Sequence, residues 1–138
     1  MIQHTLVIIK NDAIERGLVG EIISRFESAG MQIRTMVFDS FGREKWEWHY
    51  AEHAGKPHFE SLISHMAYKD VVLLVLRGHD VIFRVRRMLG ATNALEALPG
   101  TIRGDYGNRT AVIADNLVHA SDSPEAAKRE IGVWFGGG

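Results

Sequence analysis

The sequence contains no cysteine and no long hydrophobic run. The absence of cysteine excludes disulfide frameworks, thiol nucleophiles and thiolate zinc sites, and nothing in the chain requires an oxidising compartment. The longest apolar stretch, residues 71–76, is far too short to span a bilayer. The first ten residues contain a strand-like run instead of the basic start and apolar core of a signal peptide. We therefore expect a soluble cytoplasmic protein without a membrane partner.

A strong net charge is also absent, since the formal charge is -1 and the isoelectric point is near 6.7. General nucleic-acid binders normally present a basic surface, so this balance argues against a nucleic-acid partner and requires any phosphate site to be local. With 138 residues, 46% of them hydrophobic, the chain can bury the core of one compact domain. We expect a single domain over residues 1–138, with a flexible glycine tail at 136–138.

The Walker A phosphate loop is missing, and a zinc-peptidase pattern is present only formally. The Gly55-Lys56 pair is followed by Pro57, where that loop requires Ser or Thr. Residues 49–53 match H-x-x-E-H, which would place both histidines on one helix face. A catalytic zinc site also needs a third protein ligand and a substrate cleft, and so short a pattern arises readily by chance. Zinc binding is therefore a weak hypothesis.

Hydrophobic patterning predicts an alternation of strands and helices. Short apolar runs predict strands at residues 5–9, 31–38, 71–76 and 117–119. Helical spacing predicts helices around residues 22–26, in two stretches between 43 and 68, at 79–89, and from 123 to 135. This order contains the split β-α-β unit of the ferredoxin-like sandwich, so we expect an α+β fold in which helices cover an antiparallel sheet.

Three regions carry clear capping, charge and turn signals. Ser123 is a good N-cap and Pro124 suits the first helical position, so a helix should begin there. The helix at 79–89 carries arginines between its apolar positions and should present a cationic face. Turn-forming residues dominate from Gly90 to Asp115, where we expect a long functional loop with residues 112–113 as one ordered piece.

The stretch NLVHASDS at residues 116–123 places His119 at a predicted strand-to-helix junction. A phosphoryl-accepting imidazole needs open space, a partner for its second ring nitrogen, and positive charge near the transferring oxygens. Ala120 and Ser121 are small, the following helix N-terminus is electropositive, and Glu130 is spaced to reach back as an orienting carboxylate. From spacing alone, a packed histidine at a strand end is still the simpler interpretation.

Six stretches, in the same order, resemble the nucleoside diphosphate kinase family and extend over nearly the whole chain. They are IIKNDAI, VGEIISRFESAG, HYAEHAGKPHF, RRMLGATN, PGTIRGDY and NLVHASDS, the last of which matches the specific signature N-x-x-H-[GA]-S-D. The resemblance implies that a nucleoside triphosphate such as ATP gives its γ-phosphoryl group to His119 and that another nucleoside diphosphate collects it. It also implies Mg²⁺ bound through the nucleotide phosphates without protein ligands, and a homo-oligomer, either a tetramer or a hexamer.

The same resemblance assigns roles to individual side chains. Glu130 would hydrogen-bond to His119, and Ser121 would support that carboxylate. Lys10 would contact phosphate and sugar, and Tyr50 would lie beside the phosphoryl path. Six further residues would bind the nucleotide, with His58 and Leu62 at the base, Arg86, Thr92 and Arg103 at the phosphates, and Asn116 at the ribose.

Several positions depart from the family pattern. Asn11 replaces a proline, residues 66–70 lack the usual Ser-Gly-Pro turn, and His58 replaces the phenylalanine that stacks on the base. A neutral imidazole is a smaller and wetter stacking plane, so His58 should change base affinity. The loop between Arg103 and Asn116 is about three residues longer than usual, and loops of this kind are often functional.

Two alternatives from other functional classes remain open at this point. One is a catalytically inactive, kinase-like protein that binds nucleotides for regulation, and the other is a nucleic-acid-binding role, which the near-neutral charge disfavours. Every position with an assigned chemical role carries a competent residue, which favours an active enzyme. Because the resemblance places the specific contacts on phosphate and sugar, we expect broad tolerance for the base.

Overall fold

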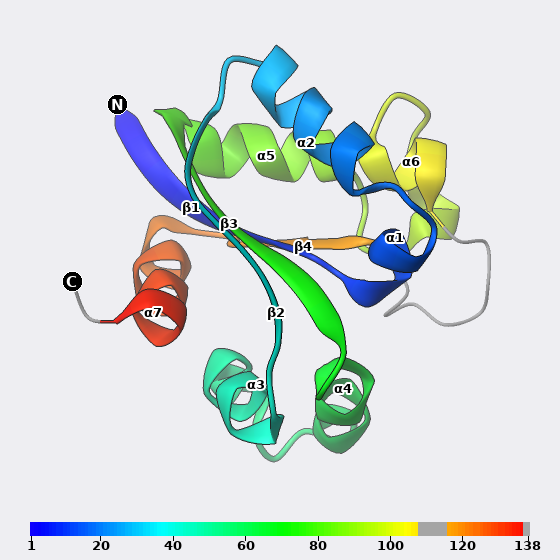
Figure 1. The fold of residues 1–138 in the computed structure, drawn as a ribbon, viewed down its shortest axis with the longest axis vertical. Helices are drawn as coiled ribbons and strands as arrows, with labels where there is room; N and C mark the ends of the chain where they lie inside the picture. The colour runs from blue at the N-terminus through cyan, green and yellow to red at the C-terminus, as the bar shows by residue number, and fades with distance from the viewer. Residues whose placement is uncertain (108–115, 137–138) are drawn as a thin grey trace.

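The structure is a computed structural model that describes residues 1–107 and 116–136. Its centre is a four-stranded antiparallel sheet in the order β2-β3-β1-β4 (Figure 1). The strands are β1 (Ile2–Ile9), β2 (Gln32–Ser40), β3 (Asp70–His79) and β4 (Val118–Ala120). All four predicted strands are confirmed, and the first three extend beyond their predicted bounds into exposed residues.

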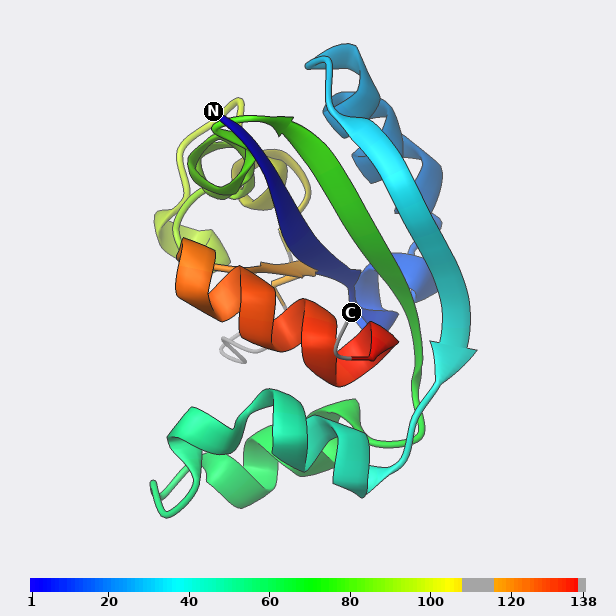
Figure 2. The ribbon, with the colours of Figure 1, turned by 90° about the vertical axis from the view of Figure 1, so that its left-hand side faces the viewer.

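Helices cover both faces of this sheet (Figure 2). One face packs against α1 (Asn11–Glu15), α2 (Val19–Ser28), α5 (Val81–Leu89) and α6 (Ile102–Tyr106). The other face packs against α3 (Arg43–His49), α4 (Phe59–Met66) and α7 (Pro124–Phe135). Two short 3-10 turns, η1 (Ala51–His53) and η2 (Ala94–Glu96), complete the described elements. The expected ferredoxin-like α+β fold is confirmed.

Alternation along β1 divides the core into two parts. Val7 and Ile9 belong to the cluster under α2 and α5, whereas Leu6 and Ile8 belong to the cluster under α3, α4 and α7. Successive strand residues point to opposite faces, and here both faces are covered. This explains why the sequences of β1 and β3 contain continuous apolar runs. A strand with one exposed face would instead alternate between apolar and polar residues.

The start of the last helix follows its predicted cap. Ser123 Oγ accepts a hydrogen bond from the backbone N–H of Ala126 at 3.0 Å, and Pro124 occupies the first helical position. The hydroxyl satisfies an otherwise unpaired N–H of the first turn, and the proline ring pre-sets the backbone for the helix. This cap fixes where α7 begins and therefore which of its residues face the sheet.

Three details differ from the sequence-based predictions. The helix expected at 79–89 begins at Val81, because β3 continues to His79 and pairs there with Ile2. The short helix α1 was not predicted. The region expected to be a long loop contains the helix α6, which Thr101 caps by accepting a hydrogen bond from the N–H of Gly104 at 3.0 Å.

The glycine in α6 is required by the close approach of the preceding turn. A Cβ atom at Gly104 would lie 1.9 Å from the carbonyl oxygen of Leu98. The ordered piece predicted at residues 112–113 and the last two glycines of the expected tail lie outside the described residues. No helix within residues 1–107 and 116–136 is long and apolar enough to cross a membrane.

Candidate active site

The position of His119 is set by β4 and by a strained residue just before it. His119 pairs with Ile8 of β1, and its neighbours in the strand are buried on the opposite face of the sheet. Leu117 adopts a φ of 72°, a left-handed conformation uncommon for leucine. Its N–H donates to Asp12 Oδ2 at 3.1 Å, and its carbonyl accepts from the N–H of Lys10 at 2.8 Å. These bonds tie the start of β4 to α1 and to the residue that follows β1.

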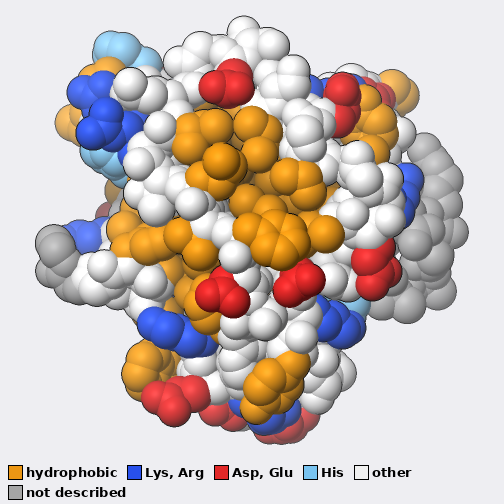
Figure 3. All heavy atoms as spheres, in the orientation of Figure 1, with side chains coloured by type: hydrophobic (Ala, Val, Ile, Leu, Met, Phe, Trp, Pro, Cys, Tyr) orange, Lys and Arg blue, Asp and Glu red, His pale blue; other side chains and the backbone are white. Residues whose placement is uncertain are grey.

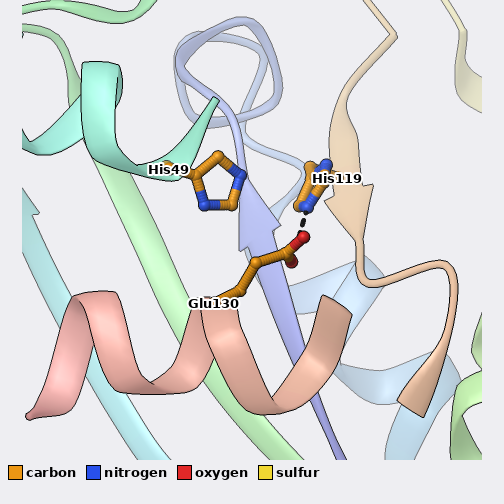
Figure 4. Close-up of side chains that lie close together, drawn as sticks. All are labelled: His49, His119 and Glu130. Carbon is orange, nitrogen blue, oxygen red and sulfur yellow. Dashed lines mark hydrogen bonds and ion pairs between the residues drawn. The ribbon is translucent and has the colours of Figure 1, made fainter. Parts of the chain in front are cut away.

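Glu130 on α7 reaches back to His119, as predicted. Its Oε1 lies 3.1 Å from Nε2 of His119 (Figure 4). The same oxygen accepts a hydrogen bond from Ser121 Oγ at 2.9 Å. Glu130 and Ser121 are buried, whereas the His119 side chain is 23% exposed. A carboxylate only accepts hydrogen bonds, so Nε2 of His119 carries the proton and the neutral ring has its lone pair on Nδ1. That nitrogen points away from Glu130 (Figure 4).

A cavity of about 760 Å³ opens beside His119. It is lined by every residue to which a nucleotide contact was assigned, namely Lys10, His58, Leu62, Arg86, Thr92, Arg103 and Asn116, together with Tyr50 and His119. Three of these residues are cationic, and no carboxylate is present among the described residues that line the cavity. The near-neutral net charge meant that any phosphate site had to be local. This cavity is such a local cationic site, and it adjoins His119.

A chain of three residues crosses the floor of the cavity. Lys10 Nζ donates to Asn116 Oδ1 at 3.1 Å, and Asn116 Nδ2 donates to the carbonyl of Thr92 at 2.9 Å. Lys10 and Asn116 are only 5% and 6% exposed. The ammonium group is a hydrogen-bond donor only, so this buried lysine brings positive charge to the cavity while a neutral amide orients it. Lys10 and Asn116, which were both expected to contact the sugar, therefore lie side by side.

Arg103 braces the backbone around the cavity. Its guanidinium donates from Nε to the carbonyl of Asn116 at 3.1 Å, from Nη1 to that of Gly90 at 3.0 Å, and from Nη2 to that of Val118. Burial, with the nearby charge of Arg86, lowers the pKa of Arg103 to about 10, so it is still a cation at neutral pH. Three of the five guanidinium N–H groups are thus committed to carbonyls, and two are left for a phosphate.

Tyr50 and the histidines at the cavity rim sit at different depths. Tyr50 is 8% exposed with its ring centroid 6.3 Å from that of His119, and burial, aided by Glu130, raises the pKa of its hydroxyl. His58 immediately precedes α4, and its ring centroid lies 5.7 Å from that of His53. Burial, followed by the charge of Lys56, lowers the pKa of His53.

The H-x-x-E-H pattern does not form the predicted helix face. α3 ends at His49, and a 3-10 turn carries Glu52 and His53 away, so His53 lies at the cavity rim while His49 is buried. Within the described residues, the metal-type group that does form is His49 with His119 and Glu130, whose ligand atoms lie within 4.8 Å of one another (Figure 4). The sequence drew attention to His49 only through the H-x-x-E-H pattern. It did not indicate that His49 would lie against His119 and Glu130.

Tyr106, at the start of the extended loop, is not part of the cavity lining. Its hydroxyl donates to Glu21 Oε1 at 2.8 Å, and the Arg25 guanidinium lies 4.8 Å from its ring centre. These contacts fasten the end of α6 to α2 instead of to the nucleotide side. The rest of the loop, residues 108–115, lies outside the described residues.

Comparison with known proteins gives consistent matches along the chain. A sequence model of the family "Nucleoside diphosphate kinase" matches residues 3–137. A nucleoside diphosphate kinase of Pyrococcus furiosus is 51% identical over 134 residues, which are 97% of this chain and 83% of that protein. The solved structure of the Aquifex aeolicus nucleoside diphosphate kinase superposes with a TM-score of 0.92 at 39% identity, covering 98% of this chain and 96% of the other. That of a halophilic nucleoside diphosphate kinase of Halobacterium salinarum, in complex with CDP, gives 0.91 at 40% identity, covering 98% and 88%.

Proposed function

The chain belongs to the nucleoside diphosphate kinase family and is a nucleoside diphosphate kinase, and from this premise we propose that His119 carries the phosphoryl group between the two nucleotides. The observation that supports this most strongly is the bond from Nε2 of His119 to Glu130 beside a cationic cavity. Incubation with γ-labelled ATP and Mg²⁺ tests the proposal. It should give a protein-bound label that is lost in acid and retained in alkali, as expected of a phosphohistidine, and an unlabelled protein would contradict it.

In the first half-reaction the Nδ1 lone pair of His119 attacks the γ-phosphorus of a bound nucleoside triphosphate. The new N–P bond forms as the bond from the γ-phosphorus to its bridging oxygen breaks, and the nucleoside diphosphate leaves with that oxygen. Lys10, Arg86 and Arg103 supply the positive charge that stabilises the phosphoryl oxygens in the transition state. Glu130 balances the positive charge that develops on the imidazole.

In the second half-reaction a different nucleoside diphosphate occupies the same cavity. An oxygen of its terminal phosphate attacks the phosphorus on His119, the N–P bond breaks, and Nδ1 recovers its lone pair. Because both nucleotides use one site in turn, the kinetics should be ping-pong. Glu130 holds the proton on Nε2 throughout, so the same ring nitrogen is available in each cycle.

Mg²⁺ fits this site as a component of the nucleotide. The described residues that line the cavity offer cations, hydroxyls and amides but no carboxylate, and Mg²⁺ prefers charged oxygen ligands. We therefore propose that the ion is held by phosphate oxygens, where it neutralises part of their charge. The chain's own cations, Lys10, Arg86 and Arg103, then position the phosphates that carry it.

The base should lie at the rim formed by His58 and Leu62, which both line the cavity. Replacing His58 with phenylalanine should tighten ADP binding by about 2- to 10-fold, because a larger apolar ring stacks better on the base. Isothermal calorimetry at constant pH measures this change. The matched variant His53→Phe, whose ring centroid lies 5.7 Å from that of His58 on the same rim, should change the affinity less. Unchanged or weaker binding in His58→Phe would show that the base is held elsewhere.

We further propose that two copies of the chain associate along β2, which is an edge strand of nine residues. Met36 and Phe38 on this strand are each 59% exposed, and hydrophobic side chains gather on the face along which β2 runs (Figure 3). A long, apolar edge strand is normally covered, and an antiparallel copy of itself would pair its free backbone groups. Such a dimer can be the unit of the expected tetramer or hexamer.

The double substitution Met36→Lys and Phe38→Lys should dissociate the assembly, because it places four like charges across the symmetric contact. Light scattering coupled to size exclusion would show a fall in mass toward that of the 15.4 kDa chain. The variant Trp48→Lys, which removes an exposed aromatic side chain from α3, should keep the wild-type mass. An unchanged mass in the double variant would place the contact on another surface. Cytoplasmic localisation stays a prediction.

A further inference from the structure

A second imidazole, that of His49, lies against His119 and has no role in the two half-reactions of phosphoryl transfer. His49 is the last residue of α3, is 2% exposed, and is absent from the described lining of the nucleotide cavity. Its ring centroid lies 4.7 Å from that of His119, with the two planes at 79°. It therefore contacts the ring that is proposed to carry the phosphoryl group without contacting the nucleotide.

The protonation of His49 is set by Trp134 on α7. The indole Nε1–H of Trp134 lies 3.0 Å from Nδ1 of His49, in a buried contact. An indole N–H can only donate, so Nδ1 must accept and the neutral ring carries its proton on Nε2. Moving that proton to Nδ1 would set two hydrogens against each other. The tryptophan thus selects one of the two tautomers of His49.

The surroundings of His49 also favour its neutral form. Burial, followed by the charges of His119 and Arg129, lowers the pKa of His49 well below its usual value. The titratable and charged groups that act on it come from every side, and they are Lys10, Tyr50, His53, His119, Arg129 and Glu130. A neutral imidazole adds no positive charge that would compete with His119 for Glu130.

The Nε2 edge of His49 is turned toward the pair that performs the reaction. One of its ring nitrogens faces His119 and the other points away (Figure 4), and the one bonded to Trp134 is Nδ1. The backbone of His49 is fixed as well, since its carbonyl accepts from Arg129 Nη2 at 3.1 Å. Because Trp134, Arg129 and Glu130 all belong to α7, one helix orients both imidazoles.

We propose that His49 is a positioning residue for His119, held by Trp134 in the tautomer whose Nε2–H faces His119 and Glu130. This inference rests on the proposed role of His119. The perpendicular ring of His49 restricts rotation of the His119 ring, and its fixed N–H dipole favours the carboxylate charge of Glu130. Nδ1 of His119 is thereby kept on the line of attack. The same tautomer lacks the Nε2 lone pair that a metal ion would need to bridge His49, His119 and Glu130.

Substitution of His49 separates positioning from folding. Asparagine at position 49 can still accept from Trp134 through its side-chain oxygen, but it has no group that reaches His119. We expect His49→Asn to slow the maximal single-turnover rate of phosphohistidine formation by about 10- to 100-fold, because small misplacements of a reacting group cost this much. The ATP concentration at half-maximal rate should stay unchanged. His49→Gln, which extends an amide N–H to the Nε2 position, should recover part of the rate.

The control is His4→Asn, an exposed histidine on β1, which should match the wild type. A wild-type rate in His49→Asn would overturn the proposal. So would a joint change of rate and half-saturating ATP concentration, which would indicate a general structural disturbance. Absence of phosphohistidine in the wild-type protein would instead overturn the role of His119 itself, so the two failures are distinguishable.

A second measurement needs no change at position 49. Nitrogen-15 NMR of histidine-labelled protein reports directly which ring nitrogen is protonated. In the wild type His49 should carry its proton on Nε2 alone, and in Trp134→Phe both tautomers should be populated. A proton on Nδ1 of wild-type His49, or no change of tautomer in Trp134→Phe, would show that the tryptophan does not set it.

Discussion

Replacing His119 with alanine should abolish phosphoenzyme formation and reduce nucleotide turnover by about 10⁴-fold or more, the scale seen when a catalytic nucleophile is removed. The His119 ring borders the cationic cavity and is bonded to the buried carboxylate of Glu130. The label from γ-labelled ATP should therefore disappear, and the coupled assay for triphosphate synthesis should fall to background.

Nucleotide binding should survive the same substitution. Lys10, Asn116 and Arg103 are held by one another and by backbone carbonyls, not by His119. Calorimetry should therefore give an ADP affinity close to that of the wild type. The control variant His79→Ala, which removes an exposed histidine at the end of β3, should keep both label and turnover. A label that persists in His119→Ala would place the phosphoryl group on another residue.

Replacing Glu130 with glutamine should lower the rate of phosphoenzyme formation by about 10²- to 10³-fold, the usual cost of removing one electrostatic partner of a developing charge. The amide oxygen can still accept from His119 and Ser121, so the geometry of the pair is retained while its negative charge is lost. The imidazole that becomes positive on phosphorylation is then unbalanced in a buried setting. Rapid-quench measurement of the labelled protein gives this rate.

The matched control is Glu125→Gln, which removes the same charge from the exposed first turn of α7. It should leave the phosphorylation rate unchanged. Ser121→Ala should cause a smaller loss than Glu130→Gln, because it removes one hydrogen bond to the carboxylate but not its charge. Equal rates in the Glu130 and Glu125 variants would mean that Glu130 only packs against His119.

Much of the fold was predictable because local patterns and tertiary structure agree. The apolar runs of β1 and β3 are buried on both faces, and Ser123 with Pro124 marks the start of α7. The helix α6 was missed because glycine and turn residues dominate its surroundings, although Thr101 is a suitable cap. Its glycine is required by a backbone contact with Leu98 that no local pattern records.

The site was predictable where residues lie close in sequence or on a recognised motif. His119 lies on β4 and Glu130 lies on α7, which begins four residues after that strand ends, at a recognisable cap. Their pairing could therefore be predicted from a short segment of the chain. His49 was noticed only through a formal zinc pattern, because its real neighbours come from a distant helix and strand. Likewise, three hydrogen bonds from Arg103 to backbone carbonyls show a bracing function that its charge alone did not suggest.

The alternative of an inactive nucleotide-binding protein finds no support in the family match or in the geometry. The His119 and Glu130 pair is assembled, the cations line the adjoining cavity, and the relatives with high identity over nearly the whole chain are nucleoside diphosphate kinases. A regulatory protein has no need of an imidazole that is bonded to a buried carboxylate beside a cationic cavity. The arrangement instead suits repeated transfer of a phosphoryl group.

The most direct test of this account is to locate the phosphorus in the phosphorylated protein. Combined phosphorus-31 and nitrogen-15 NMR of histidine-labelled enzyme, prepared with ATP and Mg²⁺ and freed of nucleotide, identifies the nitrogen that bears the phosphoryl group. We expect a single N–P bond, at Nδ1 of His119, that is lost when a nucleoside diphosphate is added. Phosphorus on Nε2 of His119 or on any other residue, or a protein that takes up none, would contradict the account.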